Sequence, residues 1–274
     1  MDKTSLDFIL QNASTKGLIY CSKELNIPYK KLYGYCVRHK IDFKRKAYKY
    51  NLYSELTPLI NIDSPETAYT LGFLWGDGSI NKKSTKTSIG IVETDGLELE
   101  PIFNLNNEWN TCLYTPKNIN WKRQITFYSN SKFIYNFLDE NGYSIKTGGS
   151  ANLILSKIKD ELKPFWFRGY SDADGCFYYH KKQSLFQYQI TSCFDQEWDF
   201  MENIFNYLDI PYQIDRRTTI DKLGKPHSRS NIRFQGKFKI QKWGEYLYDS
   251  YYKDSIGLLR KYNKYLNCIS SINK

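Results

Sequence analysis

The chain has 274 residues, 41% of them hydrophobic, and its 24 Tyr and 16 Phe argue against intrinsic disorder. Six scattered cysteines without a C-x-x-C spacing argue against a disulfide framework and a structural zinc site. No apolar run approaches a membrane span, and the first residues lack an apolar signal segment. We therefore expect an intracellular protein in a reducing compartment, cytoplasmic or organellar, with no membrane partner.

The charge of the chain is unevenly distributed. The net charge is +10, and residues 1–50 hold eleven Lys and Arg against four Asp and Glu, which leaves only +3 for the rest. A basic N-terminal segment on a mildly basic body indicates a nucleic-acid partner. A solubilising excess of lysine is the alternative.

Residues 15–45 predict a helix-turn-helix. Apolar residues recur at helical spacing over Lys16–Leu25, Asn26-Ile27-Pro28 breaks the pattern, and a second helix follows over Tyr29–His39. The predicted apolar face of the second helix consists of Leu32, Tyr33, Cys36 and Val37. Its other face holds Lys30, Lys31, Tyr35, Arg38 and Lys40. A basic second helix after a short turn is suited to the major groove, although a plain helical hairpin with a solvated face has the same pattern.

The segment from Lys44 to Leu59 is predicted to be a tether. Its basic start, Lys44-Arg45-Lys46, is a candidate for contact with a phosphate backbone. An ordinary solvated linker is equally consistent with the residues.

Two later stretches, Ala68–Ser79 and Phe165–Cys176, have nearly the same pattern. Each is predicted to be a helix, the first beginning after an N-cap at Ser64 and the second near Pro164. Small residues recur four positions apart in both, and positions with this spacing share one helix face. These residues are Gly72 and Gly76 in the first stretch and Gly169 and Ala173 in the second. A face without bulk allows two helix backbones to approach closely.

Asp77 and Asp174 end the two predicted helices. If the helices cross at their small residues, the two carboxylates converge, and paired carboxylates suit hard divalent cations. A helix C-terminus disfavours an acid, so the repeated placement indicates a bound cation. The alternative is a pair of ordinary core helices that end in glycine.

Alternating segments after each helix predict antiparallel strands with one apolar and one polar face. We expect strands at 87–93, 111–115, 121–128, 185–191, 212–219 and 230–234. The polar residues Gln187, Gln189 and Thr191 could hydrogen-bond to base edges, or they are merely solvent-exposed.

A further echo links Ser131-Lys132-Phe133 to Gly236-Lys237-Phe238, with about eight extra residues before the second copy. We assign the extra residues to a longer hairpin over Thr219–Asn231. Basic residues in and beside this hairpin are candidate phosphate contacts. They are Arg216, Lys222, Lys225, His227 and Arg229. A solvated charged loop is the alternative.

The paired stretches resemble the LAGLIDADG motif of homing endonucleases. Thr70–Gly78 is a diverged copy, with Trp75 at the place of the first acid, and Phe167–Gly175 is a closer one that keeps Asp-Ala-Asp-Gly. The resemblance covers roughly residues 63–274. It implies an α+β fold of two pseudo-symmetric αββαββα halves with saddle-shaped antiparallel sheets, beside the small all-α helix-turn-helix domain.

The resemblance also implies site residues. It places Mg²⁺ or Mn²⁺ at Asp77 and Asp174, with the preceding Gly76 and Ala173 at the same site. It further nominates Lys146 and Lys253 as basic residues beside the metals, where they can polarise the attacking water or stabilise the phosphorane.

These observations predict a site-specific double-strand DNA endonuclease that hydrolyses phosphodiester bonds with divalent metal. The expected partner is double-stranded DNA with a long asymmetric target, bound by a monomer. The expected organisation is a helix-turn-helix domain at 1–50, a linker at 51–62 and two halves at 63–158 and 159–274. Two alternatives stay open: a splicing maturase that binds intron RNA, and a non-cutting transcription regulator of the same fold.

Overall fold

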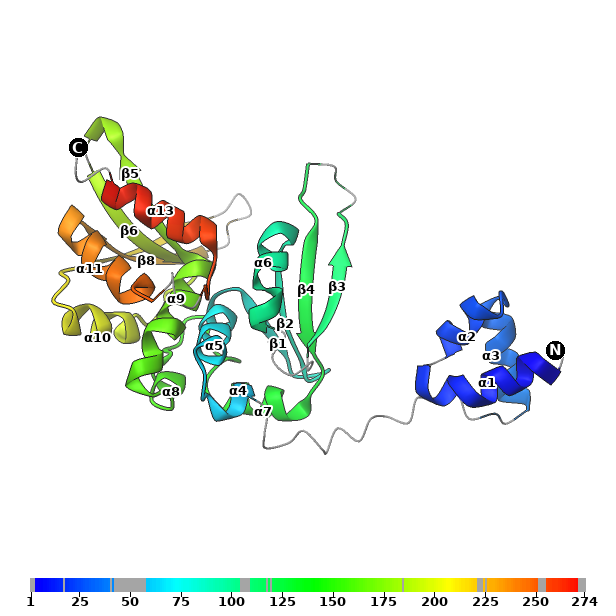
Figure 1. Cartoon of the computed structure of the whole chain (residues 1–274). Coiled ribbons are helices and arrows are strands. Elements are labelled where there is room, and N and C mark those ends of the chain that lie inside the picture. The colour runs from blue at the N-terminus through cyan, green and yellow to red at the C-terminus, as the bar shows by residue number, and fades with distance from the viewer. Residues whose placement is uncertain are drawn as a thin grey trace. The chain divides into compact units, whose positions relative to one another are not determined.

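The computed structural model describes most of the chain. The described residues are 3–16, 18–39, 41, 58–103, 109–116, 118, 120–183, 185–220, 224, 226–250 and 255–270. The chain divides into two compact units, residues 1–54 and 55–274 (Figure 1).

The first unit is all-helical. It contains α1 (Lys3–Lys16), α2 (Leu18–Glu24) and α3 (Tyr29–Arg38), with Pro28 at the N-cap of α3. Its own core consists of Ile9, Ala13, Leu18, Cys21, Leu32 and Cys36. The two helices of the predicted helix-turn-helix are therefore present as α2 and α3, whereas α1 was not predicted.

One detail of α3 differs from the sequence prediction. Leu32 and Cys36 are buried, but Tyr33 and Val37 are 45% and 52% exposed. The unit is small, so its core covers only a narrow stripe of this helix. The expected four-residue apolar face was therefore too wide.

The second unit begins with α4 (Pro58–Asn61), which lies within the predicted linker. Leu59 and Ile62 are almost fully buried in the main core. The end of the expected linker is thus part of the folded unit.

The first half of this unit has the order αββαββα. Its elements are α5 (Pro65–Asp77), β1 (Gly78–Asn81), β2 (Lys86–Val92), α6 (Glu93–Phe103), β3 (Asn110–Tyr114), β4 (Gln124–Ser129) and α7 (Lys132–Glu140). The four strands form an antiparallel sheet in the order β1-β2-β4-β3. The short helix α8 (Asn152–Leu155) and the 3-10 helix η3 (Asp160–Leu162) lead to the second half.

The second half repeats this order. Its elements are α9 (Lys163–Asp174), β5 (Gly175–His180), β6 (Leu185–Ser192), α10 (Asp199–Tyr207), β7 (Gln213–Ile220), β8 (Pro226–Gln235), α11 (Lys237–Tyr248) and a further α13 (Leu259–Ser270). A 3-10 turn, η4 (Lys181–Gln183), joins β5 to β6. The sheet order β5-β6-β8-β7 matches that of the first half, which confirms the expected α+β fold with two αββαββα halves.

Local sequence explains where these elements begin. Ser64 caps α5, since its Oγ accepts a hydrogen bond from the Thr67 amide at 3.2 Å, and Pro65 occupies the first turn. The echoed Lys-Phe pairs begin α7 and α11, so the echo marks equivalent helices. The strands β7 and β8 are longer than β3 and β4, but their hairpin, 213–235, has only three residues more than 110–129. Most of the extra residues lie earlier, at 193–198 between β6 and α10, because α6 follows β2 directly. The assignment of these residues to the hairpin was therefore wrong for most of them.

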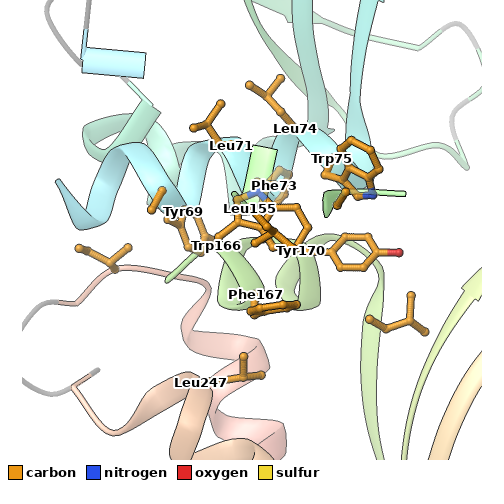
Figure 2. Packing of buried hydrophobic residues seen from close by; sticks show 14 of the residues in the cluster. Tyr69, Leu71, Phe73, Leu74, Trp75, Leu155, Trp166, Phe167, Tyr170 and Leu247 are labelled. Atoms are coloured by element: carbon orange, nitrogen blue, oxygen red, sulfur yellow. The ribbon is translucent and has the colours of Figure 1, made fainter. Parts of the chain in front are cut away.

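A single apolar core runs through both halves. Its centre is the contact of α5 with α9, which pack against each other between the two sheets (Figure 1). Figure 2 shows the large side chains that surround this contact. Trp166 of α9 is fully buried, with its ring 6.3 Å from that of Trp75 of α5.

Candidate functional site

The helices α5 and α9 touch through backbone. A Cβ atom on Gly72 would overlap the carbonyl oxygen of Trp166, and one on Gly169 would overlap that of Tyr69. Nearer the helix ends, a Cβ on Gly76 would lie 2.5 Å from the Cβ of Ala173. The four small residues therefore form the crossing face that the sequence predicts.

This crossing brings Asp77 and Asp174 together. The two acids are the last residues of α5 and α9, and a Cβ on Gly76 would lie 3.1 Å from Oδ2 of Asp174. Both side chains are exposed, so a ligand can reach them.

The surroundings of the two acids disfavour their negative charge. The adjoining helix ends displace part of their hydration, which raises the pKa of Asp77 from its ordinary value. The same desolvation and the nearby Asp77 raise the pKa of Asp174 to about 6. A divalent cation between the two would reverse both effects. No group of three or more His, Cys, Asp or Glu side chains is arranged for a metal among the described residues, so side chains of these types supply at most two ligands here.

Lys146 lies beside the pair, as the resemblance implies. Its Nζ donates hydrogen bonds to the carbonyl oxygens of Leu74, Trp75 and Gly76 at 3.1, 2.8 and 2.6 Å. It therefore caps the C-terminus of α5, where a cation is favoured. Burial lowers the pKa of Lys146 to about 8, while Asp174 and Asp77 oppose that shift.

Gln196, from the second half, holds the segment that carries Lys146. Its side-chain amide nitrogen donates to the carbonyl oxygen of Lys146 at 3.2 Å and to that of Gly149, and its Oε1 accepts from the Gly148 amide at 3.3 Å. The basic residue of the first half is thus fixed partly by the second half.

Lys261 is the second basic residue at this site. Its Nζ donates to the carbonyl oxygen of Gly175 at 2.6 Å and to that of Ser171 at 3.4 Å, so it caps α9 as Lys146 caps α5. Lys261 is 7% exposed, and burial lowers its pKa. Lys253, the sequence candidate, lies outside the described residues. Lys261 is eight residues later in a charged helix, where no local signal distinguishes it from a surface lysine.

The polar face of the second sheet carries the predicted strand residues. Gln187, Gln189 and Thr191 are half-buried, opposite in direction to the buried Phe186, Tyr188 and Ile190. The Gln187 amide donates to Oε1 of Gln189 at 2.8 Å, so these side chains are held in a row.

Strand register decides which basic residues share that face. Thr191 pairs with Asn231, and residues two apart on β8 point the same way, so Arg229 and His227 lie on the polar face. Arg217 pairs directly with Arg229, so it lies on the same polar face as Arg229 and His227. Like charges opposite each other are unfavourable without an anion.

Arg216 departs from the prediction. It pairs in register with the buried Ser230, on the other face of the sheet. Its Nε lies 2.6 Å from Oδ1 of Asp195, and Nη2 lies 3.4 Å from the Gln196 carbonyl oxygen. Arg216 therefore secures the loop before α10, and the neighbouring Arg217 takes the expected position.

The first sheet has an equivalent polar face that the sequence analysis did not single out. Ser88 pairs with Tyr128, and Gly90 pairs with Thr126. The Lys86 ammonium lies 4.6 Å from the centre of the Tyr128 ring. The alternation over 121–128 could have identified Thr126 and Tyr128 before the structure.

In the first unit, Lys30, Lys31 and Arg38 are exposed on α3, and Tyr35 is half-buried with its ring 4.1 Å from that of His39. The exposed basic side of α3 is thus as predicted. Several candidates lie outside the described residues. These are Lys40, Lys44, Arg45, Lys46, Lys222 and Lys225.

A cleft of about 650 Å³ lies elsewhere in the second unit, lined by residues of α8, α9, α10 and α11. Phe167, Phe200 and Ile204 contribute to its lining, together with the exposed Tyr207. It includes neither Asp77 nor Asp174, so it is distinct from the carboxylate pair. Across the residues that the structure describes, no helix is both long and apolar enough to cross a membrane.

No family model and no curated protein matches the chain. Among solved structures, the homing endonuclease I-WcaI bound to its DNA recognition sequence is 16% identical, with a TM-score of 0.48 over 83% of this chain and 96% of that chain. Mesophilic variants of the homing endonuclease I-DmoI are 14% identical, with a TM-score of 0.42 over 69% and 96%. Full-length DUF199/WhiA from Thermatoga maritima is 12% identical, with a TM-score of 0.42 over 80% and 66%.

Proposed function

We propose that this chain is a site-specific double-strand DNA endonuclease of the LAGLIDADG type. The observation that carries the proposal is the pair of exposed acids, Asp77 and Asp174, at the ends of two helices in backbone contact. The glycine-lined crossing fixes the spacing of the carboxylates, and nothing in the apolar core requires an acid at either position. Two convergent carboxylates fit Mg²⁺ or Mn²⁺, which take oxygen ligands.

A bound divalent cation supplies neutralisation of the scissile phosphate and a lower pKa for an attacking water. Asp77 and Asp174 would hold the cation, and the preceding Gly76 and Ala173 would belong to the same site. Lys146 and Lys261 add positive charge on the two sides of the pair. Their many hydrogen bonds to backbone fix them in place, so their charge is already oriented where negative charge develops on the phosphate.

The polar sheet faces are suited to duplex DNA. Amide side chains such as Gln187 and Gln189 can read base edges in the major groove, and the Arg217 and Arg229 pair can neutralise phosphates. The exposed basic side of α3, with Lys30, Lys31 and Arg38, is a second candidate contact. Removal of the first unit should then weaken binding and reduce its salt dependence by about 0.9 in the log–log slope for each phosphate that is no longer neutralised.

The test begins with the parent protein, a randomised duplex library and Mg²⁺, followed by sequencing of cut ends. A substrate chosen from the cut sequences is then offered to Asp77→Asn and Asp174→Asn. Each variant should lose double-strand cleavage and keep most of its DNA affinity, because affinity rests on many contacts and the cation on these two. Asp139→Asn, a matched change at an exposed acid of α7, should cut at the parent rate.

Two outcomes would overturn the proposal. Cleavage of both strands by either site variant at the parent rate would show that the acids are not the centre. Tight binding by the parent without any cleavage in Mg²⁺ or Mn²⁺ would favour the non-cutting regulator.

A further inference from the structure

Two charged residues of α9 are buried, each directly before one of the small residues of the crossing face. Arg168 is 1% exposed and Asp172 is fully buried. At the corresponding positions of α5 stand Leu71 and Trp75, which are both buried and apolar. A buried charge is unfavourable unless it is fully hydrogen-bonded, so this one-sided pair requires an explanation.

Arg168 binds the segment that follows α11. Its Nε donates to the carbonyl oxygen of Leu247 at 2.5 Å, its Nη1 to that of Ile256 at 2.7 Å, and its Nη2 to Oγ of Ser250 at 3.0 Å. The planar guanidinium thus joins the end of α11 to the residues just before α13.

Asp172 binds the start of α13. Its Oδ2 accepts from the Leu258 amide at 2.8 Å, and the Leu258 carbonyl oxygen accepts from the Lys261 amide at 2.9 Å in the first turn of the helix. A carboxylate at a helix N-terminus is favourable because the free amide groups and the helix dipole both attract it. Tyr248 and Tyr69 donate their hydroxyl groups to the same carboxylate at 2.7 and 2.9 Å.

The first turn of α13 returns to the candidate centre. It carries Lys261, whose Nζ donates to the carbonyl oxygen of Gly175. Gly175 directly follows Asp174, so the chain path runs from Asp172 through Leu258 and Lys261 back to the end of the same helix. In sequence, Asp174 therefore lies between two residues that are bound to the start of α13, Asp172 on one side and Gly175 on the other.

We propose that each of the two helix ends, with its acid and its lysine, serves one DNA strand, and that Arg168 and Asp172 are positioning residues for the end of α9. They hold the N-terminus of α13, and with it Lys261, at the end of α9. Cleavage of one DNA strand depends on them, whereas cleavage of the other relies on Lys146, which is fixed by a different set of contacts. This inference rests on the proposed function and adds that only one of the two strand cleavages depends on Arg168 and Asp172.

The test uses the full chain and two substrates: a supercoiled plasmid that carries one target site, and a linear duplex of the same site whose two strands carry different end labels. The variants are Asp172→Asn and Arg168→Met, with Arg168→Lys as the conservative change. We expect nicked circles to accumulate, because one strand is cut near the parent rate and the other at least about tenfold more slowly, as for a misplaced catalytic group. Arg168→Lys should recover part of the slow step, since it keeps the charge and still donates hydrogen bonds, although from one nitrogen instead of three.

Phe205→Leu is the control for a purely structural effect. Phe205 is fully buried in the core of the same half, where its ring contacts those of Phe234 and Trp243. This variant should lose thermal stability without any strand bias. If Asp172→Asn does not fold, Tyr248→Phe removes one hydrogen bond of Asp172 and keeps the ring, and it should show the same bias more weakly.

Equal slowing of both strands in Arg168→Met and Tyr248→Phe, in proportion to the decrease in stability, would overturn the inference and leave the proposed function intact. A parent protein that cuts neither strand would instead overturn the proposed function. A bias toward the same strand in all Arg168, Asp172 and Tyr248 variants, absent from Phe205→Leu, supports the positioning role.

Discussion

The two halves of the second unit have the same topology but are stabilised differently. At their contact, α5 and α9 present small residues at equivalent positions, and each ends in an exposed acid. At the positions directly before these small residues, α5 carries the apolar Leu71 and Trp75, and the Trp75 and Tyr143 rings meet edge to face at 5.1 Å. At the corresponding positions, α9 instead carries the hydrogen-bonded Arg168 and Asp172.

This difference separates what the site requires from what the fold tolerates. Both copies have the backbone contact and the terminal acid, which together form the candidate site. The neighbouring buried positions need only to leave no polar group without a hydrogen bond. Apolar packing meets this need in α5, and a hydrogen-bond network meets it in α9. In both halves a lysine nevertheless caps the end of the helix, Lys146 at α5 and Lys261 at α9.

The largest effect is expected from bulk in the shared face. Gly72→Ala and Gly169→Ala each place a methyl group against a carbonyl oxygen of the opposing helix, so the helices must separate. We expect each to lower the free energy of unfolding by about 3 kcal/mol, the upper end for overpacking, and to stop cleavage. Urea unfolding and cleavage rates measure both effects.

The matched control for this change is Gly90→Ala on β2, where the nearest atom to an added Cβ is Oγ1 of Thr126 at 3.8 Å. It should change stability by no more than about 0.5 kcal/mol. If Gly169→Ala is tolerated but Gly72→Ala is not, the two glycines do not make equivalent contacts, and the proposed equivalence of α5 and α9 at their crossing would be wrong.

The next effect distinguishes the two lysines. Lys261→Met leaves the Gly175 carbonyl oxygen without this donor in a buried place, at a cost of about 2 kcal/mol for an unsatisfied group. Lys146 is less completely buried than Lys261, so water can replace part of its bonds in Lys146→Met, and we expect about half that loss. Denaturant unfolding of both variants gives the ranking. An equal decrease in the free energy of unfolding of both variants would mean that the difference in burial between Lys146 and Lys261 does not affect their contributions to stability.

Much of the shared architecture could be predicted because it is encoded locally. The glycine spacing predicts the helix contact, Ser64 and Pro65 mark a helix start, and the alternation over 87–93 and 185–191 predicts the central strands. The paired motif then identifies Asp77 and Asp174. Each of these signals lies within a few residues of the structure that it specifies.

What could not be predicted depends on long-range packing. The short β1 has one apolar residue in Gly78–Asn81, too few for a pattern. Lys261 belongs to a charged segment whose burial is set only when α13 packs on β5. Arg216 and Arg217 are adjacent in sequence, and only the register with β8 determines which of them faces the polar side.

A smaller effect concerns DNA binding by the two sheets. The second sheet places Arg217 opposite Arg229, whereas the first has Lys86 over Tyr128. We expect the double variant Arg217→Ala with Arg229→Ala to reduce the log–log salt slope of binding by up to about 1.8, and Lys86→Ala by at most about 0.9. Titration at several salt concentrations measures the slopes. An unchanged slope in the double variant would place the longer hairpin away from the phosphates.

The smallest effect is on the stability of the metal-free protein. The pKa of Asp174 is raised to about 6 in the fold, above its ordinary value near 3.8, by desolvation and by Asp77. The fold therefore favours the protonated acid, and this stabilisation is complete below the unfolded pKa and lost as the pH rises through about 6. In chelator, the parent should melt a few degrees higher at pH 5 than at pH 7 on account of this group.

The variant Asp174→Asn provides the comparison that isolates the pair of acids. It has no charge to lose at this position, so it should melt above the parent at pH 7 and gain less on acidification. Acids that are not coupled to Asp174, such as the buried Asp172, contribute equally to both proteins and cancel in the difference between the two melting curves. Added Mg²⁺ should raise the melting temperature of the parent at pH 7 and not that of the variant, because only the intact pair binds the cation. If Asp174→Asn melts below the parent at pH 7 in chelator, the fold does not disfavour the charged Asp174, and the raised pKa that desolvation and Asp77 give this acid would have to be rejected.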